Sequence, residues 1–100
     1  MIRDRWHLRV SDVESWNECE RLCDELNKLF ASKGWTQGTF WTPKAGPWGE
    51  MIMEFDYTDL ATMQKEDEEL FADPEFNKLF TEFNHLSREE SFYNELLQTA

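Results

Sequence analysis

The sequence predicts an α+β fold in the element order β-α-β-β-α-β, and three observations support this prediction. Residues 2–10 and 50–57 alternate apolar and charged side chains, which is the period-2 pattern of strands with one buried face. Residues 12–33 and 58–85 carry apolar side chains at spacings of three and four, which is typical of amphipathic helices. A turn-rich connection joins two of the strands directly. This order is the ferredoxin-like arrangement, a four-stranded antiparallel sheet with both helices on one face.

Length and charge narrow the class of protein. One hundred residues fit one domain, 1–100. The net charge of −11 argues against nucleic acid and anionic membrane surfaces as partners, because contact with phosphate needs clustered Lys and Arg. No apolar run approaches the roughly 20 residues of a membrane span, and no apolar segment of a secretory signal follows Arg5. We therefore expect a cytoplasmic protein.

The first expected strand, residues 2–10, has one apolar and one basic face. The apolar face is formed by Ile2, Trp6, Leu8 and Val10, with Asp4 among them, and the basic face by Arg3, Arg5, His7 and Arg9.

The first expected helix begins near Asp12, because Ser11 and Glu14 match a capping box. Lys33 followed by Gly34 predicts its end. Cys19 and Cys23 lie one helical turn apart, and we interpret both as reduced core residues rather than as a redox pair or half of a zinc site. The buried stripe of this helix is predicted to contain Trp16, Cys19, Leu22, Cys23, Leu26, Leu29 and Phe30.

Residues 36–42 and 50–57 are predicted to form a hairpin, with Pro43, Gly46 and Gly49 in the connection. Phe40 and Trp41 should point to opposite faces of the sheet. In the second strand, Met51, Met53, Phe55 and Tyr57 alternate with Glu50, Ile52, Glu54 and Asp56.

The second helical region can be capped by Thr58 or Asp59. Its acidic run, residues 66–69, is interpreted as a solvated helix face. Asp73 followed by Pro74 predicts a break or kink. A second apolar stripe follows, ending near His85, and residues 91–97 form the last expected strand.

The predicted topology places the first and third strands side by side. Since both helices need the apolar faces, the basic face of the first strand should lie beside Glu50, Glu54 and Asp56 on the uncovered side of the sheet. Rings next to this charge ladder offer a surface that a second, identical sheet could cover, which predicts a homodimer through the sheet faces.

The sequence resembles the dimeric α+β barrel superfamily, and within it the NIPSNAP-like and antibiotic-biosynthesis-monooxygenase-like (ABM-like) small proteins. The resemblance rests on the element order, on residues 55–61 leading into an acidic helix, on residues 71–76, and on Ser91 with residues 95–97. It implies two protomers forming a dimeric α+β barrel, with a cavity between sheet and helices or within the barrel. It implies no particular reaction, because members include oxygenases, haem enzymes and isomerases.

His7 is the candidate catalytic residue, as a base that takes a proton from an acidic carbon or phenol, and the alternative is a histidine within the charge ladder. Arg5 and Arg9 could hold an anionic ligand, although Glu54 is placed to neutralise them. Trp41 could stack on a flat ligand or be buried at the dimer seam.

His85 lies roughly where haem-degrading members of the superfamily carry an iron-ligating histidine, but the aromatic residues before it are more simply core. We expect no cofactor and no metal.

The resulting expectation is a small homodimer that binds an anionic or aromatic organic molecule next to Arg5, His7, Arg9, Trp41 and Glu54. The alternative is a cofactor-independent monooxygenase-like enzyme with His7 as its base. A haem-binding protein using His85 is a third and weaker candidate. The sequence does not decide whether the protein is an enzyme.

Overall fold

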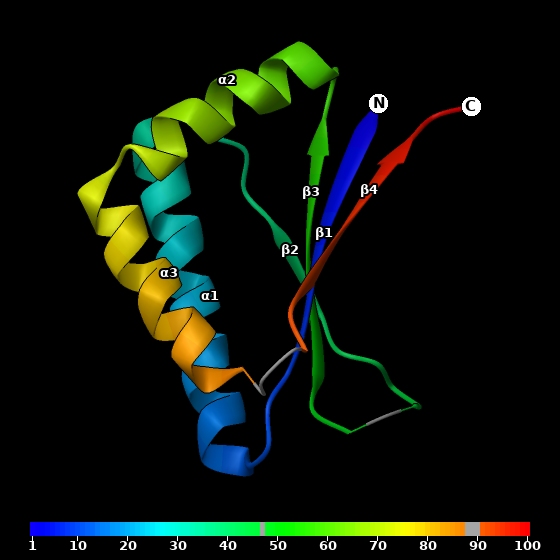
Figure 1. Cartoon of the computed structure of the whole chain (residues 1–100), viewed down its shortest axis with the longest axis vertical. Helices are drawn as coiled ribbons and strands as arrows, with labels where there is room; N and C mark the ends of the chain where they lie inside the picture. The colour runs from blue at the N-terminus through cyan, green and yellow to red at the C-terminus, as the bar shows by residue number, and fades with distance from the viewer. Residues whose placement is uncertain (47, 88–90) are drawn as a thin grey trace.

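The computed structural model describes residues 1–46, 48–87 and 91–100. The elements are β1 (Ile2–Arg9), α1 (Val13–Lys33), β2 (Thr39–Trp41), β3 (Glu50–Tyr57), α2 (Leu60–Phe71), α3 (Pro74–Leu86) and β4 (Tyr93–Gln98). Figure 1 shows the helices gathered on one side of the sheet, with α1 and α3 alongside each other. The predicted α+β arrangement is confirmed.

The sheet order is β2-β3-β1-β4, and every pair of neighbours is antiparallel. β1 and β3 are therefore the central strands, as expected. Arg5 lies opposite Glu54 on β3 and opposite Glu95 on β4. Since directly opposed residues share a face, this register places the basic face of β1 against carboxylates on both sides.

The core lies between the sheet and the helices. Its largest fully buried side chains are aromatic and come from α1, β3 and α3, namely Phe30, Phe55, Phe76 and Phe83. Trp6 packs against Phe55 with ring centroids 5.0 Å apart. Phe40 also packs on this core, while Trp41 lies on the other face with 52% of its surface exposed. The expected alternation of these two rings is therefore correct.

α1 begins one residue later than a Ser11 cap would require. The cap is Asp12, whose side chain accepts a hydrogen bond of 2.7 Å from the backbone N–H of Ser15. A carboxylate at this position satisfies an otherwise unpaired N–H and also suits the positive end of the helix dipole. The helix ends as predicted at Gly34, whose φ of 74° is left-handed.

β2 is shorter than the predicted strand at residues 36–42. Asn27 on α1 donates to the carbonyl of Gly38 and accepts from its N–H, both at 2.8 Å. Glu66 on α2 accepts hydrogen bonds from the backbone N–H and the hydroxyl of Thr36. Backbone groups that side chains already pair cannot join the ladder, so the strand begins at Thr39.

The predicted break at Asp73 and Pro74 separates two helices, α2 and α3. Asp73 caps α3 by accepting from the N–H groups of Glu75 and Phe76, and its other oxygen lies 3.4 Å from Lys33 Nζ. These contacts hold the pKa of Asp73 below its ordinary value.

Both cysteines are buried free thiols, as interpreted from the sequence. Burial raises the pKa of Cys19 to about 11 and raises that of Cys23 as well. Neither thiol therefore ionises near neutrality. None of the helices in the described ranges is both long enough and apolar enough to cross a membrane.

Candidate functional site

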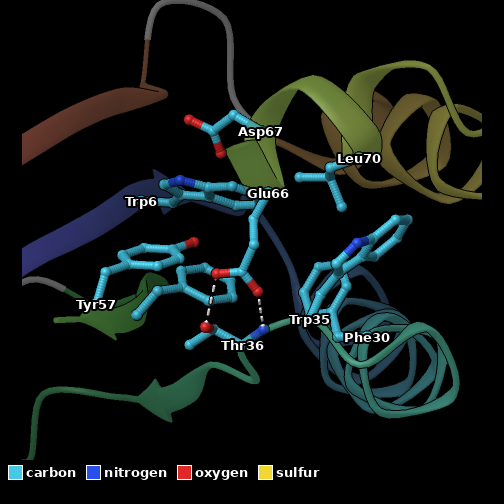
Figure 2. Close-up of a pocket in the computed structure, with 9 residues that line it drawn as sticks. Trp6, Phe30, Trp35, Thr36, Tyr57, Glu66, Asp67 and Leu70 are labelled. Atoms are coloured by element: carbon cyan, nitrogen blue, oxygen red, sulfur yellow. Dashed lines mark hydrogen bonds between the residues drawn. The ribbon is translucent and has the colours of Figure 1, made fainter. Parts of the chain in front are cut away.

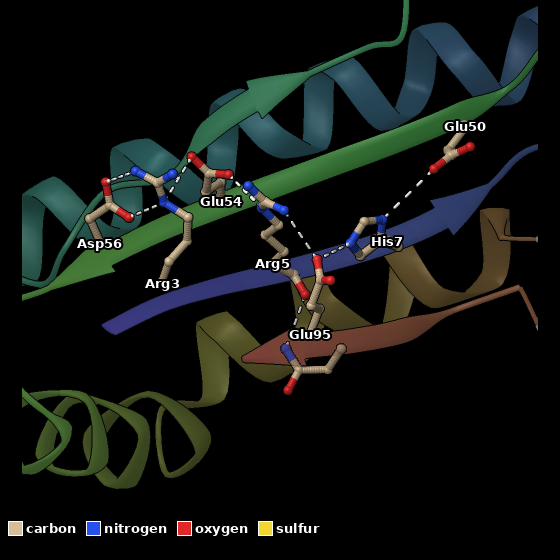
Figure 3. Close-up of polar contacts among 8 residues, drawn as sticks. Arg3, Arg5, His7, Glu50, Glu54, Asp56 and Glu95 are labelled. Carbon is tan, nitrogen blue, oxygen red and sulfur yellow. Dashed lines mark hydrogen bonds and ion pairs between the residues drawn. The ribbon is translucent and has the colours of Figure 1, made fainter. Parts of the chain in front are cut away.

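The uncovered face of the sheet carries a continuous ladder of charges from β1, β3 and β4 (Figure 3). Arg3 Nε lies 2.8 Å from Asp56 Oδ1, and Arg5 Nε lies 2.8 Å from Glu54 Oε2. Arg5 also reaches Glu95 at 3.3 Å. The predicted meeting of the basic face of β1 with the acidic face of β3 is confirmed.

Glu54 is the best shielded carboxylate of the ladder, with 13% of its side chain exposed. It lies between two arginines, since Arg3 Nε is 3.4 Å from its second oxygen. The hydrogen bonds that Arg5 donates to Glu54 and Glu95 raise the pKa of Arg5 above its ordinary value. The guanidinium of Arg5 is thus already neutralised by carboxylates of the same chain.

His7 lies at the centre of the face and is only 7% exposed. Its ring stacks on Tyr93 at a centroid distance of 4.2 Å, and its Nε2 lies 3.2 Å from Glu95 Oε1. The pKa of Glu95 is lowered, first by the hydrogen bond with His7 and then by Arg5. An ionised Glu95 can only accept, so Nε2 carries the hydrogen in this contact.

The other ring nitrogen of His7, Nδ1, is buried and has no hydrogen-bond partner among the described residues. Glu50 Oε1 lies 3.8 Å from it, beyond hydrogen-bond distance. In a neutral imidazole with its hydrogen on Nε2, Nδ1 holds the lone pair and is the basic atom of the ring.

Arg9 and Trp41 complete the predicted set on this face. The guanidinium of Arg9 makes no hydrogen bond or ion pair within residues 1–46, 48–87 and 91–100; its backbone N–H donates to Ser91. Trp41 lies opposite Ile52, which shares a face with Glu54. Arg5, His7, Arg9, Trp41 and Glu54 therefore share one face, with Arg9 as its available cation.

His85 does not belong to this group. It is an exposed residue near the end of α3, which lies in the helix layer (Figure 1). His7 is on β1 and contacts Glu95 on the uncovered face of the sheet. The surface depression beside His85 is open, and Glu18, Arg21 and Glu82 line it together with Leu22 and Leu86. A porphyrin needs an apolar slot, so the residues around His85 do not fit a haem.

A second site, which sequence reasoning missed, lies on the covered side of the sheet beneath α2 (Figure 2). It is a narrow pocket with a cavity volume of about 10 Å³, room for about one water molecule. Aromatic rings from four segments form most of its wall: Trp6, Phe30, Trp35, Phe55 and Tyr57.

Two members of the acidic run on α2 line this pocket, so the interpretation of the run as a solvated face is wrong for them. Glu66 and Asp67 are half-buried, whereas Glu68 and Glu69 are exposed. The signal was present in the spacing, because both acids follow buried Met63 by three or four positions. A run of four acids hid this helical periodicity.

The charged side chains that line the pocket are all acidic. The pKa of Asp67 is raised by burial and by the neighbouring carboxylates Asp4 and Glu66. Burial, and then the charges of Asp67 and Asp4, also raise the pKa of Tyr57. Within the described parts of the chain, no group of three His, Cys, Asp or Glu side chains could hold a metal ion.

The fold is a ferredoxin-like α+β fold, and solved structures of NIPSNAP and antibiotic-biosynthesis-monooxygenase proteins share it, as the resemblance implied. A NIPSNAP domain protein from Burkholderia xenovorans superposes with a TM-score of 0.79 at 17% identity, covering 100% of this chain and 95% of the other. An antibiotic biosynthesis monooxygenase gives a TM-score of 0.75 at 15% identity, covering 100% and 99%. SnoaB, a cofactor-independent oxygenase from Streptomyces nogalater, gives 0.72 at 16% identity, covering 98% and 91%.

No family model matches the sequence, and no curated protein matches it. The similarity to solved structures therefore establishes the fold alone.

Proposed function

We propose that the protein is a homodimer that binds a small anionic or aromatic organic molecule at the uncovered face of the sheet. The observation that carries the proposal is the composition of that face. Exposed apolar side chains, Trp41, Tyr93 and Leu97, surround a ladder in which Arg3 and Arg5 are already paired with carboxylates.

Charge balance favours this face over others as the dimer contact. Three arginines oppose four carboxylates on it, so its charges nearly cancel, although the whole chain carries −11. Two copies can approach through this face without the repulsion that the rest of the surface would impose. Covering the rings removes apolar area from water at about 25 cal/mol per Å².

The ligand is proposed to lie near Arg9 and His7. Arg9 has a guanidinium that no described residue pairs, and a guanidinium binds carboxylates in a bidentate manner. The exposed ring of Trp41 can cover a flat molecule. A second sheet would enclose a site that one protomer leaves open to water.

The dimer is tested by two neighbouring leucines on β4 that point to opposite faces. Leu97 lies opposite Arg3 on the uncovered face, and Leu96 lies opposite Asp4 on the covered face. Light scattering after gel filtration should give a dimer for wild type and for Leu96→Lys, and a monomer for Leu97→Lys, which adds like charge beside Arg3. A wild-type monomer at micromolar concentration contradicts the proposal.

Ligand binding is tested with benzoate, an anionic aromatic probe, and with benzyl alcohol as its neutral counterpart. Arg9→Met should weaken benzoate binding by about tenfold, which corresponds to about 1.4 kcal/mol. Arg21→Met serves as the control, because Arg21 is exposed on α1 and pairs with Glu18. Equal loss in both variants would mean that benzoate responds only to overall charge.

The second candidate is a cofactor-independent oxygenase with His7 as its base. Two observations favour it: one similar structure is such an oxygenase, and Glu95 leaves Nδ1 of His7 as the free basic nitrogen. Because Nδ1 is buried, a substrate can reach it only if Glu50 or Tyr93 moves aside. Oxygen uptake with an anthrone-type phenol should disappear in His7→Gln, and an unchanged rate excludes this role.

A further inference from the structure

His7 lies between two carboxylates of the charge ladder, and only one of its ring nitrogens is paired. Its Nε2 lies 3.2 Å from Glu95 on β4, whereas Nδ1 is buried and makes no hydrogen bond with any described residue. Figure 3 shows the ring between Glu95 on one side and Glu50 on the other. Buried polar atoms are ordinarily paired, so the unpaired Nδ1 is an exception that the surroundings of His7 should explain.

The charged group that faces Nδ1 is Glu50 on β3. Its Oε1 lies 3.8 Å from Nδ1, and 22% of its side chain is exposed. Arg9 is opposite Glu50 in the strand register, but no ion pair joins the two in the described parts of the chain. A neutral Nδ1 and an ionised carboxylate can both only accept, so they form no hydrogen bond. A hydrogen on Nδ1 would turn the same contact into a charge-assisted one.

Protonation of His7 at Nδ1 therefore places an imidazolium between Glu50 and Glu95, at 3.8 and 3.2 Å. Opposite charges at such distances favour the charged form of a ring. Tyr93 stacks on the imidazole at a centroid distance of 4.2 Å, and the face of an aromatic ring attracts a cation.

Two cations on the same strand, Arg5 and Arg9, oppose this protonation, because both side chains lie on the same face two positions from His7. Arg5 is already neutralised by Glu54 and Glu95. The position of the proton on His7 is thus sensitive to what lies over this face, since its favourable and unfavourable neighbours are close to balance.

The same proton balances the charge of the uncovered face. With His7 neutral, three arginines oppose four carboxylates: Arg3, Arg5 and Arg9 against Glu50, Glu54, Asp56 and Glu95. The face then carries one negative charge, and protonated His7 brings the sum to zero. Two negative faces repel each other when they approach, whereas two neutral faces do not.

We propose that His7 makes the dimer contact sensitive to pH, so that protonation at Nδ1 draws Glu50 onto the ring and tightens the dimer. This inference rests on the proposed homodimer through the uncovered face. A second sheet would bury Glu50 further, which is costly for an unpaired carboxylate and less so for one with an imidazolium as its partner. Histidine side chains ordinarily change charge between about pH 5 and pH 8, where carboxylates remain ionised.

The first test is the dissociation constant of the dimer, measured by analytical ultracentrifugation at pH 8 and pH 5.5 at constant ionic strength. In wild type it should fall by about tenfold on acidification. His7→Gln keeps an N–H donor for Glu95 and cannot take up the proton, so its dissociation constant should change by less than about twofold. The chain has only one other histidine, and His85→Gln is the matched control, because His85 is exposed on α3 and should leave the wild-type response intact.

Glu50→Gln tests the charge balance without removing His7. This variant has three carboxylates against three arginines, so it should dimerise at pH 8 about as tightly as wild type does at pH 5.5. Acidification should not tighten its dimer further, because a proton on His7 would then make the face positive. Glu68→Gln removes the same charge from an exposed position of α2 and should behave as wild type at both pH values.

Nitrogen-15 NMR of the imidazole rings observes the proton itself, also if His7→Gln does not fold. His7 should show a hydrogen on Nε2 alone at pH 8 and on both nitrogens at pH 5.5. Glu50→Gln should move the midpoint of this change to lower pH, because it removes one of the two carboxylates that favour the charged ring.

Three results would overturn the inference while leaving the proposed dimer in place. They are a wild-type dimer with the same dissociation constant at both pH values, an equal response to pH in His7→Gln and wild type, and equal behaviour of Glu50→Gln and Glu68→Gln. A wild-type monomer at both pH values would overturn the proposed dimer and this inference together.

Discussion

Asp67 shows how one residue can be costly to the fold. Its carboxylate lies in an aromatic pocket beside Asp4 and Glu66, and no described cation offsets it. Burial and like charge both favour the protonated acid, which is why its pKa is raised.

Asp67→Asn should therefore raise the melting temperature of the free protein at pH 7. Because the folded pKa lies above the unfolded one, near 3.9, the folded state binds more protons and stability falls as pH rises between the two values. The penalty is fully present above the folded pKa. Asp67 is half-exposed, so its effect should be below about 1 kcal/mol, or a few degrees.

Thermal unfolding of both proteins between pH 3 and pH 8 measures this difference. The gain from Asp67→Asn should vanish below about pH 3.9, where the wild-type acid is protonated in both states. Glu68→Gln should not reproduce it. A gain that persists unchanged at low pH would show that the effect is not electrostatic.

Residue types on strands were easier to place from the sequence than those on α2. Strict alternation assigned His7 and Arg5 to the uncovered face. Side chains along a strand point to alternate faces, so the face of one residue determines the faces of the others in that strand. The same reasoning could not find the pairing of Asn27 with Gly38, because that contact depends on how the helix crosses the sheet.

At the scale of elements, the junction between the end of β1 and the start of β3 depends on Gly49. Its φ is 85°, and the N–H of Val10 donates to its carbonyl at 3.0 Å. A Cβ on Gly49 would lie 2.5 Å from the carbonyl oxygen of Val10. The close approach of two backbones, in addition to the left-handed conformation, requires glycine here.

Gly49→Ala should therefore destabilise the protein by more than about 2 kcal/mol, combining left-handed strain of 1–2 kcal/mol with a clash against backbone. Gly34→Ala is the control, since Gly34 is also left-handed at 74° but has no atom within 4 Å of an added Cβ. Urea denaturation should show the larger loss for Gly49→Ala. Equal losses would mean that the clash is relieved at no cost.

The ends of helices could be predicted from the sequence where the residues at the boundary determine the backbone conformation themselves. Gly34 correctly predicts the end of α1 and Pro74 the beginning of α3, because the conformational preferences of these residues do not depend on tertiary contacts. The shortened β2 could not be predicted, since Glu66 reaches Thr36 across 30 positions of sequence. Tertiary contacts of this kind override strand propensity.

At the scale of the whole molecule, the sheet order followed from the element order, while the nature of the sites did not. The β-α-β-β-α-β pattern restricts the topology, and short un-knotted connections leave few alternatives. The pocket beneath α2 is lined by residues from five segments that meet only in the folded chain, so no single sequence motif predicts it. For that reason the sequence predicts a solvated helix face for Glu66 and Asp67, which the structure places in the pocket lining.

Whole-molecule stability should depend on protein concentration if the uncovered faces pair. A chain of 100 residues buries a modest share of its surface, so covering the ladder and its rings would add to the stability of the folded state by mass action. A hundredfold rise in concentration adds about 2.7 kcal/mol per mole of dimer. The melting temperature of wild type should therefore rise by several degrees between about 5 and 500 µM.

Leu96→Lys should keep this dependence and Leu97→Lys should lose it, because only Leu97 lies on the uncovered face. Calorimetry at both concentrations measures the shift, and a melting temperature that stays constant in wild type would show that the folded protomer does not gain its stability from a second copy.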